Sequence, residues 1–563
     1  MNVADFAYLG IFLALLVCAA LPLGRWLADI LEARPPAMLR WLAPVERGLH
    51  RLCRIAPEQP MDWRAYAGAL LAFHLMGFVV VLALQLLQAR LPLNPAGFQA
   101  VPLGIAVNTA VSFVTNTNWQ AYSGEASLSH LTQMAGLGVQ NFLSAATGLA
   151  VMAALARGFG RQPTASLGNF WADLVRGTLY VLLPLSLLFA IVLMASGVPQ
   201  SFERNATAVT LTGAEQVIPL GPAASQVAIK QLGTNGGGFF GVNSAHPFEN
   251  PTPVSNFLQT LSLLLIPAAC VFAYGRLSGA RRHARVLFLV MLVFFVSSLG
   301  LSLWAELTPH PELGAAVAME GKEVRFGVVP SVLWAGATTA ASNGSVNAMH
   351  SSLSPIAGGA ALFNMLLGEI IFGGVGSGVY GMVAMAVIAV FLAGLMVGRT
   401  PEYLGKKIES FEIRMAAIAV LAPCAAVLLG CAASFLTEGG RAAVGNGGPH
   451  ALTEVLYAWA SMCNNNGSAF GSLNATGPLY TWGGALAMLI GRFAVIVPVL
   501  ALAGSLAAKK STPPSTGTFP TDGPLFAFLL GGTIVLVAAL SHLPALILGP
   551  VLEQLLMNAG HTF

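Results

Sequence analysis

The chain has 563 residues, of which 56% are hydrophobic and only 9% are charged, and its mean hydropathy is +0.73. A soluble domain carries about a quarter of its residues as charged side chains, so this composition excludes an ordinary soluble protein and predicts a surface that mostly faces lipid. The net charge of +4 is small and no basic run is interleaved with aromatic residues, which gives no support for nucleic-acid binding.

Ten apolar runs are long enough to cross a bilayer, since a spanning helix needs about 20 apolar residues. The first run carries Asp5 and has no basic residues ahead of it, so we interpret it as a retained helix and not as a secretory signal. The predicted spans cover residues 3–24, 64–88, 131–156, 170–197, 254–275, 283–305, 357–396, 412–436, 480–506 and 524–548. The sequence therefore predicts an all-α polytopic membrane protein.

Basic residues set the orientation of these spans. Lys and Arg gather in the connections 25–54, 157–161, 276–285, 399–414 and 509–510. All five connections fall on one side if the chain crosses ten times, and the positive-inside rule assigns that side to the cytoplasm. Both termini are then expected on the outer side.

The opposite connections are rich in Gly, Asn, Ser and Thr, and each holds an apolar stretch of about a dozen residues, too short to span. A related motif follows each stretch. The motifs are Asn116-Thr117-Asn118-Trp119-Gln120, Thr234-Asn235-Gly236-Gly237-Gly238, Ser342-Asn343-Gly344-Ser345 and Asn465-Asn466-Gly467-Ser468. A single motif is typical of an ordinary turn, but four at matching positions favour an internal repeat of helix, re-entrant helix, loop and helix over residues 64–507.

The residue types in these loops suit a dehydrated monovalent cation. Backbone carbonyls can replace the water shell of such an ion without adding a fixed charge, and glycine tolerates the backbone angles that point successive carbonyls at one axis. A short helix ahead of the loop directs its negative C-terminal end at the ion. The four loop cores lack Asp and Glu, which argues against a divalent-cation site.

The sequence resembles a known family at this point. The strings GTNGGGFF, NSAHPFENPTP, SNGS, NNNGSAF and GRTPEYLGKKIE are similar to the potassium-translocating A subunits of Kdp-type (KdpFABC) P-type ATPases, the KdpA family. The resemblance runs from end to end and implies a relation to the superfamily of potassium transporters built from four helix–pore–helix units around a pseudo-four-fold pore. It implies that the four loops form a K⁺ selectivity filter and that Gln120 is a selectivity position. The first loop departs from the others, with Trp119 and Gln120 where they place Gly, so its ligand register stays open.

The seventh apolar run is twice as long as a span and has a glycine-rich centre, a poor helix interior. We expect a broken helix whose non-helical centre lies below the filter, where it is buried in protein or lines a cavity; the alternative is two spans read as one. The resemblance implies that this segment gates the straight path to the cytoplasm. The expected gate and cavity residues are Glu369, Gly373, Gly374, Gly376, Gly378 and Arg492.

Three further groups of residues carry weaker expectations. Glu369 and Arg492 are intramembrane charges, and we expect them either to pair or to face one aqueous cavity, with independent snorkelling as the alternative. His246, Glu249 and Asn250 are expected to brace the outer rim of the filter, and not to hold a metal. Arg399, Lys406 and Lys407 are a candidate cytoplasmic docking surface for a partner or merely positive-inside charge.

The chain has no GxxxxGK[ST] motif and no DKTGT sequence, so we expect no nucleotide on it and no ATP hydrolysis by this chain alone. The resemblance implies a potassium importer in the bacterial inner membrane, with a P-type ATPase B subunit, a single-span C subunit and a small F peptide as partners. K⁺ would be selected at an outward-facing filter and passed sideways to the ATPase subunit. An ATP-independent, channel-like potassium transporter is the main alternative, and a solute carrier with inverted repeats is a weaker one because two-span repeats keep a single orientation.

The expected division of the chain follows the repeats. It comprises an N-terminal span with a cytoplasmic loop (1–63), four pore repeats (64–165, 166–282, 283–410 with the broken second helix, and 411–507) and a C-terminal span (508–563).

Overall fold

The computed structural model describes residues 2–160, 163–308, 318–398, 400–513 and 519–561. Within these residues the fold is helical apart from two small antiparallel hairpins, β1 (Asn205–Val209) with β2 (Glu215–Pro219) and β3 (Glu402–Tyr403) with β4 (Lys406–Lys407). The all-α fold class is therefore confirmed.

Ten of the described helical segments are long and apolar enough to cross a membrane, the number that the sequence predicts. They are α1 (Val3–Leu31), α3 (Trp63–Leu87, extended by η2, Gln88–Arg90), η3 (Thr132–Gly138) with α6 (Val139–Gly158), α7 (Phe170–Arg176) with η4 (Gly177–Leu182) and α8 (Leu183–Ala195), α10 (Pro253–Leu277), α11 (Arg281–Leu307), α14 (Ser377–Val397), α15 (Ser410–Leu436), η8 (Leu479–Gly483) with α18 (Gly484–Ala508), and α19 (Pro524–Leu546) with η9 (Ile547–Val551) and α20 (Leu552–Asn558).

The seventh apolar run is two helices and not one. Its first part is α13 (Pro355–Leu366), and the chain then leaves helical geometry over residues 367–376 before α14 begins. We call residues 367–376 the plug loop. Glycine accounts for the break, because Gly368, Gly373 and Gly376 all have positive φ, which a helix interior does not accept.

Four short helices precede the four Gly/Asn loops. These pore helices are α4 (Leu103–Val114), α9 (Ala223–Leu232), α12 (Val328–Ala340) and α17 (Gly448–Cys463). The remaining short helices are η1 (Ala37–Leu42), α2 (Ala43–Leu52), α5 (Gly124–Ser127), η5 (Asn243–Ala245), η7 (His350–Ser352) and α16 (Glu438–Ala442). The pore helices are too short to span, as predicted, and their buried faces place the loops inside the bundle.

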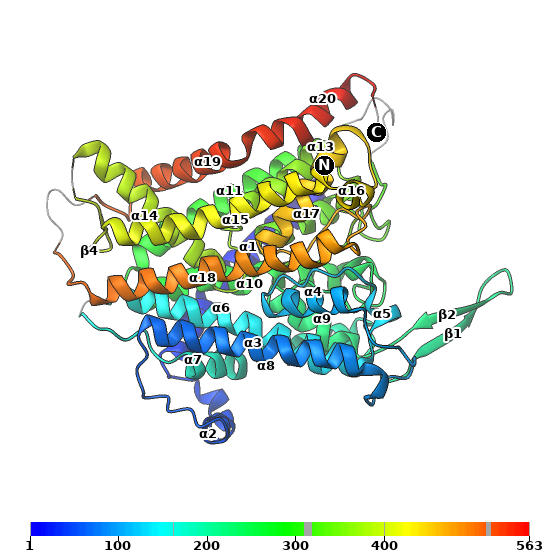
Figure 1. The fold of residues 1–563 in the computed structure, drawn as a ribbon, viewed down its shortest axis with the longest axis horizontal. Helices are drawn as coiled ribbons and strands as arrows, with labels where there is room; N and C mark the ends of the chain where they lie inside the picture. Colours follow the sequence, from blue (N-terminus) through cyan, green and yellow to red (C-terminus); the bar gives the residue numbers. More distant parts are fainter. Residues whose placement is uncertain (1, 161–162, 309–317, 399, 514–518, 562–563) are drawn as a thin grey trace.

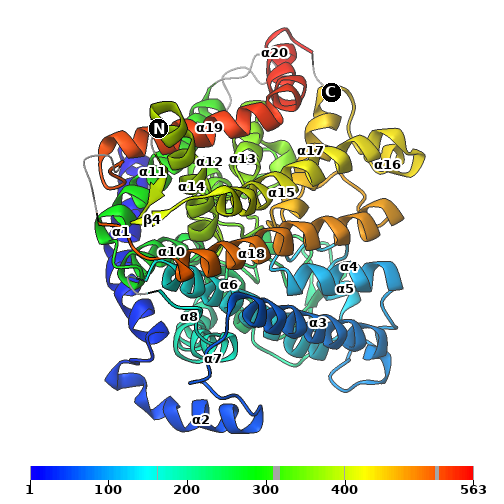
Figure 2. The same ribbon diagram turned by 60° about the vertical axis from the view of Figure 1, so that its left-hand side comes forward.

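Figure 1 shows most long helices running along the longest axis of the molecule, with α4, α9 and α17 in the half nearer the β1–β2 hairpin, which we call the pore end. The β1–β2 hairpin projects from this pore end, and both chain ends lie there as well. The turned view in Figure 2 shows α2 at the periphery of the bundle, away from α4 and α17. At the opposite end, which we call the basic end, lie β4 and the basic connections between the spans.

Close approach of helices depends on small residues, as is usual in membrane bundles. Gly24 of α1 lies against Ala269 and Phe272 of α10, and Gly158 of α6 lies against Ala503 of α18. A Cβ at Gly148 of α6 would collide with the carbonyl oxygen of Val375, so α6 packs directly on the plug loop.

Candidate functional site

The four loops adopt one backbone conformation in register. Each motif has three positions: Asn116-Thr117-Asn118 in loop 1, Thr234-Asn235-Gly236 in loop 2, Ser342-Asn343-Gly344 in loop 3 and Asn465-Asn466-Gly467 in loop 4. The first and third residues all have positive φ, from 50° at Thr234 to 104° at Gly467, and the middle residues do not. Alternation of positive and negative φ turns successive carbonyls to one side of the chain, the geometry of a carbonyl-lined filter.

The same hydrogen bond ties each loop to its pore helix. The N–H of the middle residue donates to the carbonyl of the fifth residue before it, from Thr117 to Ser112 at 2.9 Å and from Asn235 to Lys230 at 2.8 Å. The equivalent bonds join Asn343 to Thr338 at 3.2 Å and Asn466 to Ser461 at 2.8 Å. Each loop therefore begins at the negative end of its own pore helix.

The third-position glycines pack around a ring. A Cβ at Gly236 would collide with the carbonyl oxygen of Asn343 in the next loop, and one at Gly344 would collide with that of Asn466. A Cβ at Gly467 would in turn collide with the carbonyl oxygen of Thr117, which closes the ring on loop 1. Glycine is thus required twice at these positions, for its positive φ and for the absent side chain.

The structure aligns loop 1, whose register the sequence leaves open, with the other three loops. Asn118, with φ 52°, occupies the position of the third-position glycines, and Trp119 and Gln120 lie beyond it. Asparagine tolerates left-handed geometry better than most residues. Room for its side chain comes from loop 2, where a Cβ at Gly237 would lie 3.1 Å from Cβ of Asn118 and 2.9 Å from Cζ of Phe113.

The carbonyls of the four middle residues are uncommitted. Among the hydrogen bonds of the described residues, none ends on the carbonyl oxygens of Thr117, Asn235, Asn343 or Asn466. Loop 2 differs at its flanking positions. Its Thr234 carbonyl accepts from Nδ2 of Asn116 at 2.8 Å, and its Gly236 carbonyl accepts from Nδ2 of Asn243 at 2.6 Å.

Middle-position asparagines in loops 3 and 4 bind the preceding repeat. Nδ2 of Asn343 donates to the carbonyl of Lys230 at 3.0 Å, and Nδ2 of Asn466 donates to that of Thr338 at 2.9 Å. Their Oδ1 atoms accept from the backbone N–H of Ser345 and Ser468. The amide side chains therefore brace the loops from behind and leave the backbone carbonyls free.

Gln120 joins loop 1 to loop 2 by a two-way contact. Its Nε2 donates to the carbonyl of Gly238 at 3.0 Å, and its Oε1 accepts from the N–H of the same glycine at 2.9 Å. It lines the outer cavity described next, together with Asn118 and Gly236. The structure places its amide beside the loops and not among the four middle-residue carbonyls.

The loops separate two cavities. The outer cavity, of about 750 Å³, lies at the pore end and is lined by the third-position residues of all four loops. The inner cavity, of about 80 Å³, is lined by the first-position residues Asn116, Ser342 and Asn465. Either volume holds water, since one molecule needs about 10–15 Å³ by this measure. An ion that crosses between the two cavities must pass the loops.

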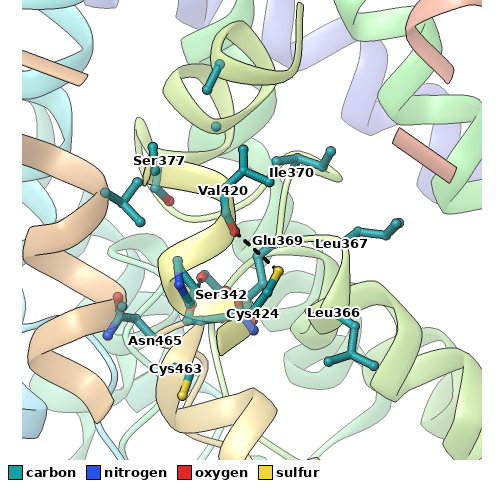
Figure 3. A pocket seen from close by; sticks show the side chains of 18 of the residues that line it. Ser342, Leu366, Leu367, Glu369, Ile370, Ser377, Val420, Cys424, Cys463 and Asn465 are labelled. Carbon is teal, nitrogen blue, oxygen red and sulfur yellow. Dashed lines mark hydrogen bonds between the residues drawn. The ribbon is translucent and has the colours of Figure 1, made fainter. Parts of the chain in front are cut away.

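Glu369 and Arg492 line the same inner cavity and do not pair directly. Figure 3 shows Glu369 in this cavity beside Ser342, with Asn465 across from it. Arg492 donates to the carbonyl of Ser144 at 2.8 Å, and no ion pair among the described residues joins it to Glu369. Both carboxylate oxygens of Glu369 are buried, no ion pair among the described residues reaches them, and the side chain of Asn466 is a polar neighbour of the carboxylate. Of the two arrangements expected from the sequence, the geometry corresponds to the shared cavity.

The plug loop lies directly against loops 2 and 3. Its Val375 N–H donates to Oγ1 of Thr234 at 3.0 Å, and the N–H of Gly373 donates to the carbonyl of Ala340 at 2.9 Å. A Cβ at Gly374 would lie 3.3 Å from that of Ser342. Gly376 contacts Gly148 of α6, and Gly378, already in α14, packs on the Phe372 carbonyl. The predicted gate glycines therefore come together beneath the loops.

The inner cavity reaches the side of the bundle. Its lining includes Val420 and Cys424 of α15 and Val537 and Ser541 of α19, all of them partly exposed. Figure 3 shows Val420 and Cys424 joined by the 3.2 Å hydrogen bond from Sγ to the Val420 carbonyl, on the side of the cavity away from Cys463. The space below the loops thus extends laterally between α15 and α19.

The candidate docking residues are not equivalent. Lys406 is buried, at 0% exposure, and its Nζ donates to the carbonyl of Lys509 at 2.7 Å, which does not fit the docking alternative for this residue. Its carbonyl acceptor lies 103 residues away, on a second basic connection, which brings the two connections together. Lys407 is exposed, and Arg399 lies outside the described residues.

The segment after loop 2 is packed tightly behind it. His246 stacks on Phe240 with ring centroids 3.9 Å apart, and burial lowers the pKa of its imidazole, although Glu249 opposes this shift. Asn250 and Glu249 are fully buried. Among the described residues no group of three or more His, Cys, Asp or Glu could hold a metal ion. The contacts are those of a structural brace.

Sequence reasoning missed two residues that hold loop 2 from behind, Lys230 and Asn243. Lys230 stands inside a short apolar re-entrant stretch, and a charged residue in such a place is itself a functional signal. Asn243 belongs to a Gly/Asn-rich outer segment with many similar residues, and only its contact with the Gly236 carbonyl distinguishes it.

Comparison with known proteins gives consistent results. Residues 10–555 match the family model of KdpA, the potassium-transporting ATPase A subunit. The chain is 55% identical to the potassium-transporting ATPase potassium-binding subunit of Sorangium cellulosum, over 97% of this chain and 98% of that protein. It is also 55% identical to the subunit of the same description from Pseudomonas aeruginosa, over 99% of each chain. Among solved structures, the potassium transporter TrkH from Vibrio parahaemolyticus is similar with a TM-score of 0.47 and 16% identity, over 75% of this chain and 83% of TrkH.

Proposed function

This chain belongs to the family of potassium-transporting ATPase A subunits, and we propose that it is the potassium-binding subunit of such an ATPase, with the four loops as its selectivity filter. The observation that carries the proposal is the set of four middle-residue carbonyls. They come from four loops of one conformation, in a ring of mutual contacts, and no described hydrogen bond uses them.

These carbonyls suit K⁺ because they are neutral oxygen ligands on a braced backbone. A ring of carbonyl dipoles replaces the water shell of a monovalent ion without the fixed charge that a divalent ion would demand. Asn343 and Asn466 bind backbone groups with their side-chain amides and so leave the carbonyls for the ion. The pore helices add the negative ends of their dipoles at the same place.

In the proposed path, K⁺ enters the outer cavity, loses its water in the filter and reaches the inner cavity. The Glu369 carboxylate, which has no cationic partner among the described residues, would attract the cation there. The plug loop lies across the straight route to the basic end. The lateral extension of the cavity between α15 and α19 supports a sideways exit from this chain.

The partner that receives the ion would be the P-type ATPase B subunit, which would bind and hydrolyse ATP, with a single-span C subunit and a small F peptide completing the complex. Membership of the family supports this assignment, and the absence of GxxxxGK[ST] and DKTGT sequences from this chain supports hydrolysis on another one. The orientation proposed for the bacterial inner membrane places both termini, which lie at the pore end, on the outer side.

The test is potassium-stimulated ATPase activity of the chain purified with the products of its neighbouring genes, compared with the chain alone. We expect stimulation by K⁺ only in the complex, and K⁺ uptake into proteoliposomes only with ATP. Full uptake by the isolated chain without ATP would overturn the proposal in favour of an ATP-independent potassium transporter.

A further inference from the structure

One position behind the filter carries a related role in all four repeats. It is the fifth residue before the middle residue of each loop, and its side chain contacts its own loop or the segment that follows. Ser112 Oγ donates to the Trp119 carbonyl at 3.0 Å, and Ser461 Oγ accepts from the Gly467 N–H at 2.9 Å. Thr338 Oγ1 lies 3.4 Å from Oδ1 of Asn343. Three repeats thus use a hydroxyl group, and the second uses Lys230.

Lys230 is a charged residue with no access to solvent. Its side chain and that of Glu249, its ion-pair partner, are both 0% exposed. Its Nζ also donates to Oδ1 of Asn243 at 2.7 Å, and Nδ2 of Asn243 donates to the Gly236 carbonyl at 2.6 Å. The second oxygen of Glu249 accepts from the N–H of Phe240 at 3.0 Å. A continuous chain of contacts therefore runs from Glu249 to a backbone carbonyl of loop 2.

The ammonium group of Lys230 sets the orientation of the Asn243 amide in this series of contacts. A lysine amine has three donors and no acceptor, so the oxygen of the Asn243 side chain must face it. The N–H₂ end of Asn243 then has to face the Gly236 carbonyl. The backbone N–H of Ser244 also donates to the Asn243 side-chain oxygen, at 2.8 Å, so two groups that can only donate hold the same orientation of the Asn243 amide.

Stability alone does not account for the ion pair. Burial of two charges is costly even when they pair, and hydrophobic residues of similar volume are often equal or better in stability. The other three repeats hold their loops without a charge at this position. What distinguishes loop 2 is that its Gly236 carbonyl accepts a hydrogen bond from Asn243. The carbonyls of Asn118, Gly344 and Gly467 accept no hydrogen bond among the described residues.

We propose that Lys230 and Glu249 are positioning residues of the ion path, which hold Asn243 on the Gly236 carbonyl and so withdraw that oxygen from the outermost ion position. This inference rests on the proposed function of the loops as a potassium filter. The outermost position then has three free carbonyls where the middle position has four. Fewer ligands make it a weaker site, through which an ion passes on its way inward, and the unequal ring contributes to discrimination between K⁺ and larger ions.

The test uses the whole complex and the ratio of the KM values for Rb⁺ and K⁺ in stimulated ATPase activity. Asn243→Ala removes the bond to Gly236 and keeps the ion pair, and Lys230→Met with Glu249→Gln removes the charges and keeps the volume. We expect both to move the ratio toward one by roughly 2- to 10-fold, the range of one hydrogen bond of ordinary net strength, with a smaller change in kcat. Lys230→Arg, which keeps the cationic donor, should move it less than the double variant.

The matched control is Arg157→Met with Asp173→Asn, which removes a largely buried ion pair at the basic end, where the Arg157 and Asp173 side chains are 26% and 2% exposed. This control should keep the wild-type ratio. A wild-type ratio in Asn243→Ala would overturn the inference, even if the double variant fails to assemble. A wild-type complex without any K⁺ stimulation would instead refute the proposed function, so the two failures are distinguishable.

Discussion

The third position of loops 2, 3 and 4 requires glycine for two reasons: the backbone there is left-handed, and a carbonyl of the neighbouring loop lies where a side chain would be. The two can be separated experimentally, because the chain also has positive-φ glycines in open surroundings. Gly344 has φ 83° and lies against the Asn466 carbonyl, whereas Gly213, between β1 and β2, has φ 82° and no atom within 4 Å of a Cβ position.

We therefore predict that Gly344→Ala raises the KM for K⁺ by roughly 10-fold or more, since the new methyl group displaces the next loop in addition to the strain of about 1 kcal/mol that left-handed geometry imposes. Gly213→Ala carries the same strain without the collision and should keep the wild-type KM. The measurement is K⁺-stimulated ATPase activity of the complex. Equal behaviour of the two variants would show that the ring contact has no role in binding.

The interlock of Asn118 with Gly237 leads to a second prediction at this scale. Gly237→Ala places a methyl group against Asn118 and Phe113 and should raise the KM for K⁺. Asn118→Gly removes one of the two side chains that the new methyl group would meet, so the double variant should recover part of the lost K⁺ affinity. The effects of the two substitutions on the free energy of K⁺ binding should be non-additive by about 0.5–3 kcal/mol, as for residues in contact. Strict additivity in this double-mutant cycle would refute the interlock.

Sequence alone could identify the loops, because four motifs of similar composition stand at matching positions. It could not assign the register of loop 1, since Asn116 and Asn118 both tolerate left-handed geometry and the choice depends on Gly237, more than a hundred residues away. The burial of Lys406 was not predictable for a similar reason. A lysine in a basic connection predicts exposure, and only the fold shows that a backbone carbonyl of a distant connection covers it.

At the scale of elements, the broken helix was predictable from its glycines, and its contacts were not. The plug loop is held by a backbone N–H that reaches Thr234 Oγ1, and by the close approach of Gly148. Neither contact has a local sequence signal, because the first uses the backbone N–H of Val375 and the second depends on Gly148 having no side chain.

We predict that Thr234→Val loosens the plug loop. Valine matches the shape of threonine but leaves the buried N–H of Val375 without its partner, which costs about 1–3 kcal/mol. The expected result is a rise of roughly 10-fold in Rb⁺ leak through the complex in proteoliposomes without ATP. Thr234→Ser keeps the hydroxyl and should stay as tight as the wild type. A leak in the serine variant equal to that in the valine variant would contradict the role of this bond.

At the scale of the whole molecule, the pattern of apolar runs and basic connections was sufficient to predict the number of spans. Each of the ten described candidates overlaps one of the ten predicted runs, since length and hydropathy depend on composition and not on packing. The seventh is shorter than predicted, and the first and tenth extend further, to Leu31 and Asn558. The pattern also predicts on which side of the membrane each connection lies, and this orientation is still to be tested.

Labelling tests this orientation. Lys407→Cys and Gly213→Cys both create exposed thiols, at the basic end and the pore end respectively. In intact cells, a membrane-impermeant thiol reagent should reach the second and not the first. The background needs Cys18→Ser and Cys53→Ser, because both of these cysteines are exposed. Labelling in the reverse pattern would invert the topology.

The plug loop bears on the energetics of the whole transporter. Carbonyl rings have no built-in direction, so a filter of this kind releases an ion outward as readily as it admits one. Every ion that returned through this chain would dissipate about 1.4 kcal/mol for each tenfold step in its concentration ratio. On the proposed function, the short glycine-rich break between α13 and α14 therefore determines the thermodynamic efficiency of uptake, that is, the fraction of the free energy of ATP hydrolysis that is stored in the ion gradient. The loops above it determine which ion is carried.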